Sequence, residues 1–388
     1  MQKYRVGILG CGPRGNSQAG AWKQLPDVEL VALCDRIEER LHTVGERHGV
    51  AQRYTDAHTM FTREALDIVS VPARADWHYP LTMLALEHGI HVIVEKPIAI
   101  DLRQADEMVA LAQARGVRLA VHHQLSVGPL QRKAKSLIAA GAIGELHTLR
   151  GAGKGYYGGF GMMETGTHIL DQMRNFGGDA TWVHAHVTVR GRDITAADVG
   201  QAPRGLGLVA GDRIMMQIAY AGGKTGLGEF SVRSKLDSRA YAVDLVGTEG
   251  MLCLRSGGGA GIYLQRDPVW HPMLGASWEE VRLTDDDARV PGTDLVSSDA
   301  GVWMAQEMVN ALRAGRDHAS SGAAGQAVLE QMLACYASQV SGGRAALPPA
   351  DRTHPLERLC TAAGLPVPDF QVRTDAEYLA AEAARLGA

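Results

Sequence analysis

The sequence predicts an α/β protein with a doubly wound parallel sheet at its N-terminus, followed by an α/β domain with a large, open and mostly antiparallel sheet. Two patterns within the 388 residues support this prediction. In the N-terminal third, short apolar runs alternate with helical patterns, as in parallel sheets whose strands are joined by helices. From about Gly144, strand-like runs follow one another with Gly-rich joints and few helices, which is typical of antiparallel sheets.

The first strand is predicted at residues 4–9, and it leads into Gly10-Cys11-Gly12-Pro13-Arg14-Gly15 and a helix that ends near residue 24. A G-x-G-x-x-G spacing between a strand and a helix is the fingerprint of a dinucleotide-binding turn. The first glycine permits the tight turn, the second lets the backbone approach a pyrophosphate, and the third lets helix and strand pack closely. Because the N–H groups at the helix start face the anion, we expect a Rossmann domain with cofactor contacts at Gly10, Gly12, Pro13, Arg14 and Gly15.

The second strand, predicted at residues 29–34, ends at Asp35, which follows the glycines by about 20 residues. An acid at this place binds the ribose diol of NAD. The neighbouring Arg36 has a guanidinium that can accept the 2′-phosphate of NADP, or it can stack near the adenine. The sequence therefore favours NAD, with NADP as the alternative.

Helices and strands then alternate up to residue 121. Helices are predicted at residues 36–48, 79–88 and 101–115, and strands at 65–71, 90–94 and 118–121. The apolar run 90–94 ends in Glu95-Lys96-Pro97. Because the ligand crevice of an open α/β sheet lies outside the carboxyl ends of its strands, we expect Lys96 to face substrate, with Val71 and Pro72 in the same crevice. A solvated Glu-Lys turn is the alternative.

In the second half, strands are predicted at residues 146–150, 182–190, 213–220, 225–231, 242–246 and 251–254. In the stretch 153–171 a glycine-rich loop runs into a helix that carries Glu164, His168 and Asp171. Helical spacings of four and three place these three side chains on one side. Residues 302–313 and 325–339 are predicted to form amphipathic helices, and the Pro-containing tail after Leu347 is an extension without an assigned role.

Composition narrows the class of partner. The formal charge is −4, without a basic cluster, which does not support binding to nucleic acid or a membrane surface. The five cysteines are scattered, so neither a disulfide framework nor a zinc site is indicated. No leader and no apolar run of about 20 residues is evident. We therefore predict a cytoplasmic protein with a small-molecule partner and no metal.

Together these motifs resemble the glucose–fructose oxidoreductase and inositol dehydrogenase family (Gfo/Idh/MocA). The resemblance extends from about Tyr4 to Pro348 and rests on the order of the motifs. They are the glycine turn, His78, Glu95-Lys96-Pro97, the stretch 141–145, the G-T-H-x-x-D of residues 166–171, and Gly247-Thr248-Glu249-Gly250.

The resemblance implies a Rossmann domain at residues 1–122, a substrate-binding and oligomerisation domain at 123–348, and an extension at 349–388. It also implies a homo-oligomer, a dimer or tetramer, formed through the C-terminal sheet. The family's substrate-contacting lysine maps onto Lys96 and its proton-transferring histidine onto His168. Where members carry a further catalytic Asp four residues before that histidine, this chain has Glu164, which is one methylene longer. The cofactor contacts then extend to Val71, Pro72, His78, Glu95, Lys96 and Gln124.

Further substrate-binding candidates come from the surroundings of these motifs. Adjacent residues of an extended chain point opposite ways, so at most one of His122 and His123 faces the site. Tyr156, Tyr157 and Phe160 can stack on a sugar or pack in the core. His184 and His186 share one strand face, but a metal needs three or four ligands. The substrate-side candidates are His123, Lys154, Tyr156, Tyr157 and Asp171, besides Lys96, Glu164 and His168.

The predicted function is NAD-dependent hydride transfer between nicotinamide and a hydroxyl carbon of a sugar, cyclitol or related polyol. In this hypothesis His168 removes the hydroxyl proton, Lys96 stabilises the alkoxide, and Glu164 orients His168. One alternative is an NAD-dependent glycosidase that works by transient oxidation, elimination, hydration and re-reduction. A non-catalytic NAD sensor is a second alternative, which the intact Lys96 and His168 pair disfavours.

Overall fold

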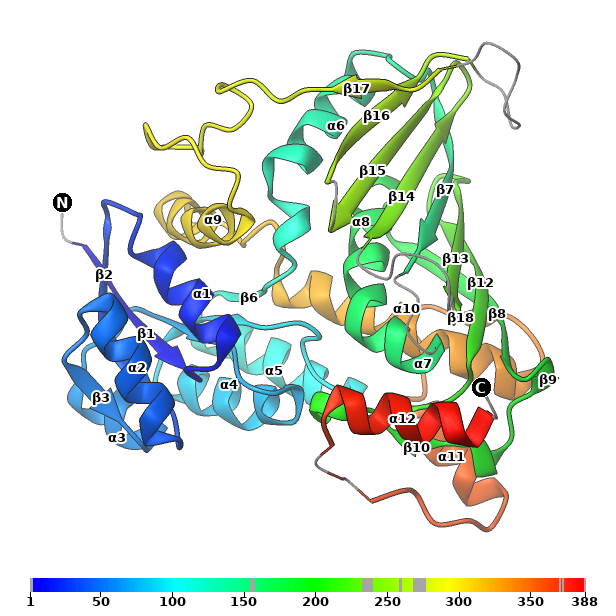
Figure 1. Cartoon of the computed structure of the whole chain (residues 1–388), viewed down its shortest axis with the longest axis horizontal. Helices are drawn as coiled ribbons and strands as arrows, with labels where there is room; N and C mark the ends of the chain where they lie inside the picture. The colour runs from blue at the N-terminus through cyan, green and yellow to red at the C-terminus, as the bar shows by residue number, and fades with distance from the viewer. Residues whose placement is uncertain are drawn as a thin grey trace. The chain divides into compact units, whose positions relative to one another are not determined.

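The computed structural model describes residues 3–153, 158–231, 240–257, 260–267, 277–369, 371 and 373–386. The chain folds into two compact units, and each of them is made from two separate stretches of sequence (Figure 1). Unit 1 comprises Met1–Gly128 and Ala288–Gln326, and unit 2 comprises Pro129–Asp287 and Ala327–Ala388.

Unit 1 is built on a six-stranded sheet in the order β3-β2-β1-β4-β5-β6, and all of its strand pairs are parallel. The strands are β1 (Tyr4–Leu9), β2 (Val28–Cys34), β3 (Gln52–Tyr54), β4 (Ile68–Val71), β5 (His91–Val94) and β6 (Leu119–Val121). The strand order reverses between β1 and β4, so the predicted doubly wound sheet is confirmed. Ligands of such sheets bind at this switch point, outside the carboxyl ends of the strands.

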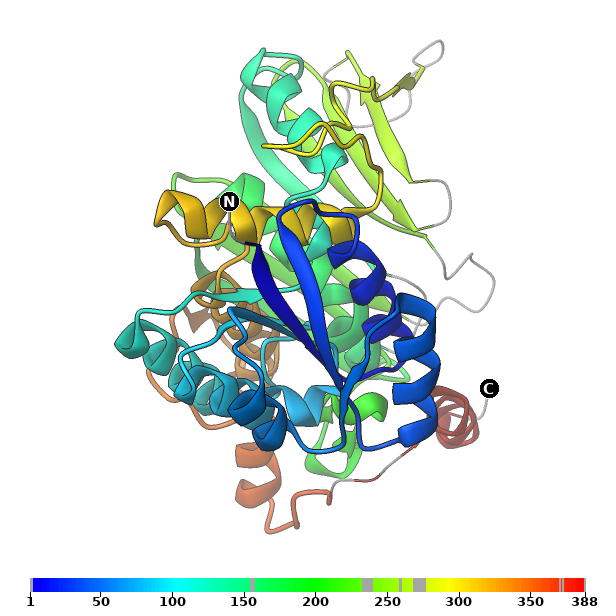
Figure 2. The same cartoon turned by 90° about the vertical axis from the view of Figure 1, so that its left-hand side faces the viewer.

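Helices cover both faces of this sheet, with the blue helices α1 and α2 on one side of the strands and the cyan helices α4 and α5 on the other in Figure 2. They are α1 (Pro13–Trp22), α2 (Glu38–His48), α3 (Ala57–Arg63), α4 (His78–Glu87) and α5 (Leu102–Arg115). Local capping explains the ends of α5. The Asp101 side chain accepts from the N–H of Arg103 at its start, and Gly116 takes a left-handed conformation (φ 65°) at its end.

The segment 288–326 returns to unit 1, which differs from the predicted continuous division at residues 122 and 348. Its helix α9 (Ala300–Ala314) packs on α1, and Val302, Met304 and Met308 are buried in one core cluster with Trp22. The apolar face of α9 therefore completes the core of the parallel sheet. An amphipathic pattern predicts such a helix but does not show which core it covers.

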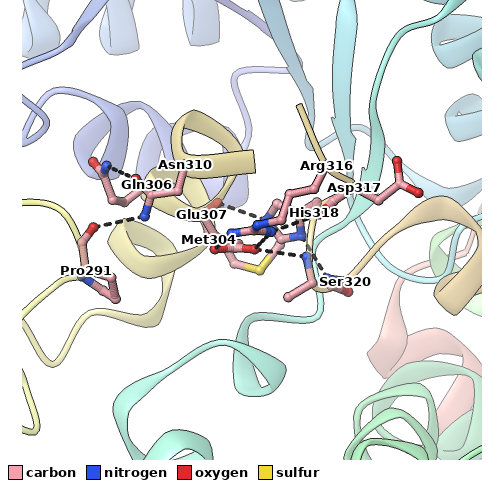
Figure 3. Close-up of polar contacts among 10 residues, drawn as sticks. Pro291, Met304, Gln306, Glu307, Asn310, Arg316, Asp317, His318 and Ser320 are labelled. Carbon is pink, nitrogen blue, oxygen red and sulfur yellow. Dashed lines mark hydrogen bonds and ion pairs between the residues drawn. The ribbon is translucent and has the colours of Figure 1, made fainter. Parts of the chain in front are cut away.

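A buried histidine holds the end of this returning segment (Figure 3). The N–H of Ser320 donates to Nδ1 of His318 at 2.9 Å, and Nε2 of His318 lies 3.2 Å from the Met304 carbonyl oxygen. Burial lowers the pKa of His318 to about 4. The ring is therefore neutral near pH 7, and it donates from Nε2 while it accepts at Nδ1. The Ser320 hydroxyl donates to the carbonyl of Val121, which ties the segment to β6.

Unit 2 contains a ten-stranded sheet in the order β17-β16-β15-β14-β7-β13-β12-β8-β18, with β9 beside β8. β7 and β13 are parallel and the other pairs are antiparallel, so the predicted mostly antiparallel sheet is confirmed. The strands are β7 (Leu146–Ala152), β8 (Ala180–Val189), β9 (Arg192–Asp193), β12 (Arg213–Tyr220), β13 (Thr225–Ser231), β14 (Ala240–Gly247), β15 (Met251–Gly257), β16 (Gly261–Gln265), β17 (Glu279–Val281) and β18 (Ala345–Ala346). A separate hairpin pairs β10 (Gly200–Gln201) with β11 (Leu208–Val209).

The two faces of this sheet differ. Along β12, Ile214, Met216 and Ile218 are buried, whereas Met215 is 38% exposed on the other face. Leu227 of β13 is 39% exposed. Helix α8 (Thr167–Gly177) packs closely on β7. The absence of a side chain at Gly151 permits this, since a Cβ there would lie 2.3 Å from Cγ2 of Ile169. Assembly through the sheet stays a prediction.

Further helices complete unit 2. They are α6 (Pro129–Ala139), α10 (Gly322–Ser341), which begins in unit 1, and the tail helices α11 (Pro355–Ala362) and α12 (Asp375–Leu386). The tail, predicted as an extension of its own, belongs to unit 2. Among the described residues, no helix is long and apolar enough to cross a membrane. All five cysteines are free thiols.

Candidate functional site

The glycine turn after β1 has the features that a pyrophosphate site needs. Gly10 has a φ of 111°, which glycine adopts readily, and a Cβ on Gly15 would lie 1.8 Å from the Gly10 carbonyl oxygen. A Cβ on Gly12 would meet nothing within 4 Å. Gly12 precedes α1 without a side-chain cap, and Pro13 opens that helix. The first-turn N–H groups therefore receive no side-chain cap from Gly12, and this fits a bound phosphate.

Asp35, at the end of β2, is joined to the same turn. Its Oδ2 accepts from the N–H of Cys11 at 2.6 Å, and its Oδ1 accepts from the N–H of Ile37 at 2.8 Å. Each carboxylate oxygen can accept a further hydrogen bond, so these bonds leave Asp35 able to bind a ribose diol. The guanidinium of Arg36 lies 5.0 Å from the ring centre of Trp77, which is 39% exposed. This cation–π pair was not predicted, because Trp77 belongs to no motif.

Glu95 is a buried anion at the end of β5. Its Oε1 accepts from Nε2 of Gln18 at 2.9 Å and lies 3.4 Å from Nδ1 of His122, while its Oε2 accepts from the N–H of Lys96. Burial alone would raise the pKa of Glu95, but the neighbouring charges, His122 and Arg14 foremost, outweigh it and hold the pKa below its usual value. Glu95 therefore anchors the base of the Lys96 turn.

His78 fixes the other side of this turn. Its Nδ1 lies 2.7 Å from the Pro97 carbonyl oxygen, and its Nε2 lies 3.1 Å from that of Ala73. Burial lowers the pKa of His78. The ring thus links the loop after β4 to the loop after β5. The family resemblance places His78 at the cofactor, whereas the hydrogen bonds of its ring are with the two loops.

Most of the remaining unit 1 candidates lie at neighbouring strand ends. Val71 pairs with Val94 in the register of β4 and β5, so Val71 and Pro72 lie beside the Lys96 turn. Oε1 of Gln124 lies 3.1 Å from Nδ1 of His122. His123 is buried.

In unit 2, Glu164 lies in a π-helical turn (Met162–Gly166) between α7 (Gly158–Gly161) and α8. The α-helical spacing used to align Glu164 with His168 therefore does not apply across this turn. π-helical turns occur often at functional sites. Three of the predicted unit 2 candidates, Lys154, Tyr156 and Tyr157, lie outside the described residues.

Three buried side chains follow one another along this helical stretch: Glu164, His168 and Asp171. Oε1 of Glu164 lies 3.4 Å from Nη1 of Arg204, and Oε2 of Glu164 accepts from the Thr165 hydroxyl. The ring of His168 stacks on that of Tyr241 at a centre distance of 6.4 Å.

Asp171 is the most deeply buried acid of this stretch. Burial raises its pKa to about 7, although Arg174 and Lys135 oppose the shift. Nδ2 of Asn175 donates to the backbone carbonyl of Asp171 at 2.9 Å. The carboxyl group of Asp171 is therefore close to half-protonated near neutral pH.

Two family models match the chain. The model described as the oxidoreductase family with an NAD-binding Rossmann fold matches residues 4–123, and the GFO/IDH/MocA C-terminal domain matches residues 131–253. The chain belongs to the Gfo/Idh/MocA oxidoreductase family. Its parallel sheet is thus an NAD-binding Rossmann domain, and the predicted family and cofactor are confirmed.

Curated relatives of this family member include the D-apiose dehydrogenase of Paraburkholderia graminis. It is 30% identical over 51% of this chain and 56% of its own length. A glycosyl hydrolase family 109 protein of Shewanella baltica is 27% identical over 38% of this chain and 34% of its own length. The chain therefore matches about half, or less, of the length of these two relatives.

A solved structure shares the fold over nearly the whole chain. It is an oxidoreductase from Agrobacterium radiobacter in complex with NAD+, L-tartaric acid and magnesium. The TM-score is 0.71 at 23% identity, and the match covers 89% of this chain and 98% of that one. Among the described residues of our chain, no group of three or more His, Cys, Asp or Glu side chains could hold a metal.

Proposed function

We propose that this protein is an NAD-dependent oxidoreductase that transfers a hydride between nicotinamide and a hydroxyl carbon of a sugar, cyclitol or related polyol. The observation that carries the proposal is the Lys96 turn, which Glu95 and His78 anchor at the carboxyl edge of an NAD-binding sheet. A lysine fixed at that edge is suited to a substrate oxygen. NAD, when bound, accepts the hydride.

Three residues of the chain then act on the substrate hydroxyl group, directly or through a neighbour. The ammonium group of Lys96 binds that oxygen and stabilises the negative charge that develops on it. His168 removes the hydroxyl proton. Glu164 supports His168, as the acid of a histidine–carboxylate pair does. Asp171, one turn beyond His168, takes a supporting role.

The substrate class rests on chemistry and on relatives. The P. graminis relative is a D-apiose dehydrogenase, which supports a sugar or polyol. We also propose that the exposed sheet face with Met215 and Leu227 joins copies of this chain, and that the protein works in the cytoplasm. Light scattering coupled to gel filtration measures the mass of the assembly, and a monomer would contradict the first of these two proposals.

The family 109 relative favours a second candidate function, glycoside cleavage with recycled NAD. That reaction needs one more base for the C–H proton next to the oxidised carbon, for which His123, Tyr156 and Tyr157 are the candidates.

One experiment separates the two reactions. The enzyme and NAD are incubated with free sugars, cyclitols and aryl glycosides in D₂O, while NADH absorbance and aglycone release are followed. Stoichiometric NADH from a free polyol supports the dehydrogenase. Aglycone release with catalytic NAD, and deuterium at the carbon next to the oxidised one, would overturn it.

A further inference from the structure

Arg204 has an unusual backbone conformation. It lies in a short 3-10 turn (Pro203–Gly205) with φ 60° and ψ 17°, in the left-handed region that non-glycine residues rarely adopt. The neighbouring Gly205 and Gly207 also have positive φ values, 71° and 80°. Such strain persists only where the surroundings hold it, and it often marks functional positions.

The side chain of Arg204 lies between Glu164 and the start of the C-terminal helix. Its Nη1 lies 3.4 Å from Oε1 of Glu164. Its Nε donates to Oδ1 of Asp375 at 2.8 Å, and its Nη2 donates to Oδ2 of the same carboxylate. Asp375 is the first residue of α12. The Asp375 carboxylate therefore binds the Arg204 guanidinium by two hydrogen bonds. This bidentate pair orients the guanidinium toward its third contact, Glu164.

The tail makes two further contacts with the same region. Tyr378 of α12 is only 6% exposed, and its ring meets that of Phe160 edge to face at 5.3 Å. Phe160 lies in α7, directly before the π-helical turn of Glu164. Nε2 of Gln201 donates to the Pro368 carbonyl at 2.8 Å. The tail thus contacts the Glu164 region through a ring pair and an ion pair.

Both carboxylate oxygens of Glu164 are engaged, one by Arg204 and the other by the Thr165 hydroxyl. Glu164 is 8% exposed, so an ionised carboxylate there needs such partners. Two partners on two oxygens also restrict the rotation of the carboxylate.

We propose that the C-terminal helix α12 is a working part of the substrate site, and that Arg204, which Asp375 binds, is the positioning residue that holds the Glu164 carboxylate in one orientation. The proposal rests on the proposed function, because Glu164 acts there through His168. It assigns a catalytic consequence to a tail that no family motif covers.

A surface ion pair without any role in catalysis is the competing explanation, since the Arg204 side chain is 50% exposed. Such pairs contribute little to stability. The two explanations differ in their effect on turnover. If the ion pair has no catalytic role, substituting Arg204 leaves kcat unchanged. If Arg204 is a positioning residue, the substitution lowers kcat more than it changes KM.

The test is a double-mutant cycle in the full-length protein. Arg204→Met should lower kcat about two- to fivefold, the effect of losing one partly exposed charge contact. KM for the sugar should change by less than about twofold. In a Glu164→Gln background, Arg204→Met should have no further effect, because it acts through that carboxylate. Arg204→Lys should restore part of the activity, since it keeps the charge but not the fork.

The matched control is Arg192→Met. Arg192 binds Asp198 by two bonds of 2.8 Å in the same unit, and its side chain is 56% exposed. This variant should keep wild-type kcat. On the tail side, Asp375→Asn should reproduce part of the Arg204→Met effect. Tyr378→Ala should lower kcat more than Tyr378→Phe, which keeps the ring on Phe160.

The possible results distinguish a failure of this inference from a failure of the proposed function. If the wild type oxidises a sugar and Arg204→Met has the kcat of Arg192→Met, or if its effect adds fully to that of Glu164→Gln, the inference is wrong. If the wild type oxidises nothing in the panel, the proposed function fails instead. Melting temperatures of the same variants then decide whether Arg204 and Glu164 interact. Additive shifts would overturn the inference, and non-additive shifts would support the ion pair on which it rests.

Discussion

Two glycines of the turn after β1 should separate NAD binding from folding. At Gly12 the backbone has φ −70° and ψ −172°, which alanine adopts without strain, and the added methyl would meet nothing within 4 Å. Gly12→Ala should therefore change the free energy of unfolding by less than about 1 kcal/mol, the scale of a helix-cap substitution. If the pyrophosphate lies against this backbone, however, the methyl blocks it, and NAD affinity should fall at least about tenfold.

Gly15→Ala is the matching substitution, and unlike Gly12→Ala it should destabilise the fold. Its methyl would lie 1.8 Å from the Gly10 carbonyl oxygen and 2.9 Å from the Gly10 carbonyl carbon, both backbone atoms. Relief requires a shift of roughly 1 Å between β1 and α1, and overpacking of this kind costs about 1–3 kcal/mol. For a domain of this size the melting temperature should fall by about 2–12 °C. NAD affinity should fall as well, because the turn itself moves.

Thermal unfolding with and without NAD measures both effects. NAD raises the melting temperature of a protein that binds it only when folded. We expect Gly12→Ala to melt like the wild type without NAD and to lose the NAD-induced increase. Wild-type NAD affinity in Gly12→Ala would refute the placement of the pyrophosphate at this turn.

Three further predictions concern the cofactor, the base and a buried acid. Asp35→Ala should reduce the preference for NAD over NADP, measured by titration of both cofactors, and tighter NADPH binding by the wild type would show that Arg36 decides the choice. His168→Ala should lower kcat/KM by about 10²–10⁴-fold and remove the basic-side activation from its pH profile, and an unchanged profile would exclude His168 as the base. Because burial raises the pKa of Asp171 to about 7, the folded state binds a proton that the unfolded state loses above pH 4. Stability from this group is therefore present at low pH and lost as the pH rises to 7, and Asp171→Asn should be more stable than wild type at pH 8 by on the order of 2–4 kcal/mol. Equal stability of the two proteins at pH 8 in urea titrations would contradict this linkage.

Strong local patterns predicted the architecture well. The predicted strands at 4–9, 213–220 and 225–231 coincide with β1, β12 and β13. Strand β3 (Gln52–Tyr54) was not predicted, since three residues without an apolar alternation carry no periodic signal. The glycine turn and Asp35 could be identified because their spacing is set by local backbone geometry.

Contacts between distant residues could not be predicted in this way. The return of α9 to unit 1 depends on which core covers its apolar face, and its pattern does not specify that. The π-helical turn at Glu164 changes the helical phase without a signature in the residue types. Arg204 and Asp375 are 171 residues apart, so their ion pair depends on the folded path of the tail.

The most direct test of the central claim is the effect of Lys96→Met on NADH formation and on NAD binding, measured on one preparation. The claim is that this lysine stabilises the developing alkoxide and does not bind the pyrophosphate. We expect turnover of the best sugar or polyol to fall by about 10²–10³-fold, or about 3 kcal/mol, while the dissociation constant of NAD stays close to that of wild type. Turnover within a few-fold of wild type, with NAD still bound, would contradict the account.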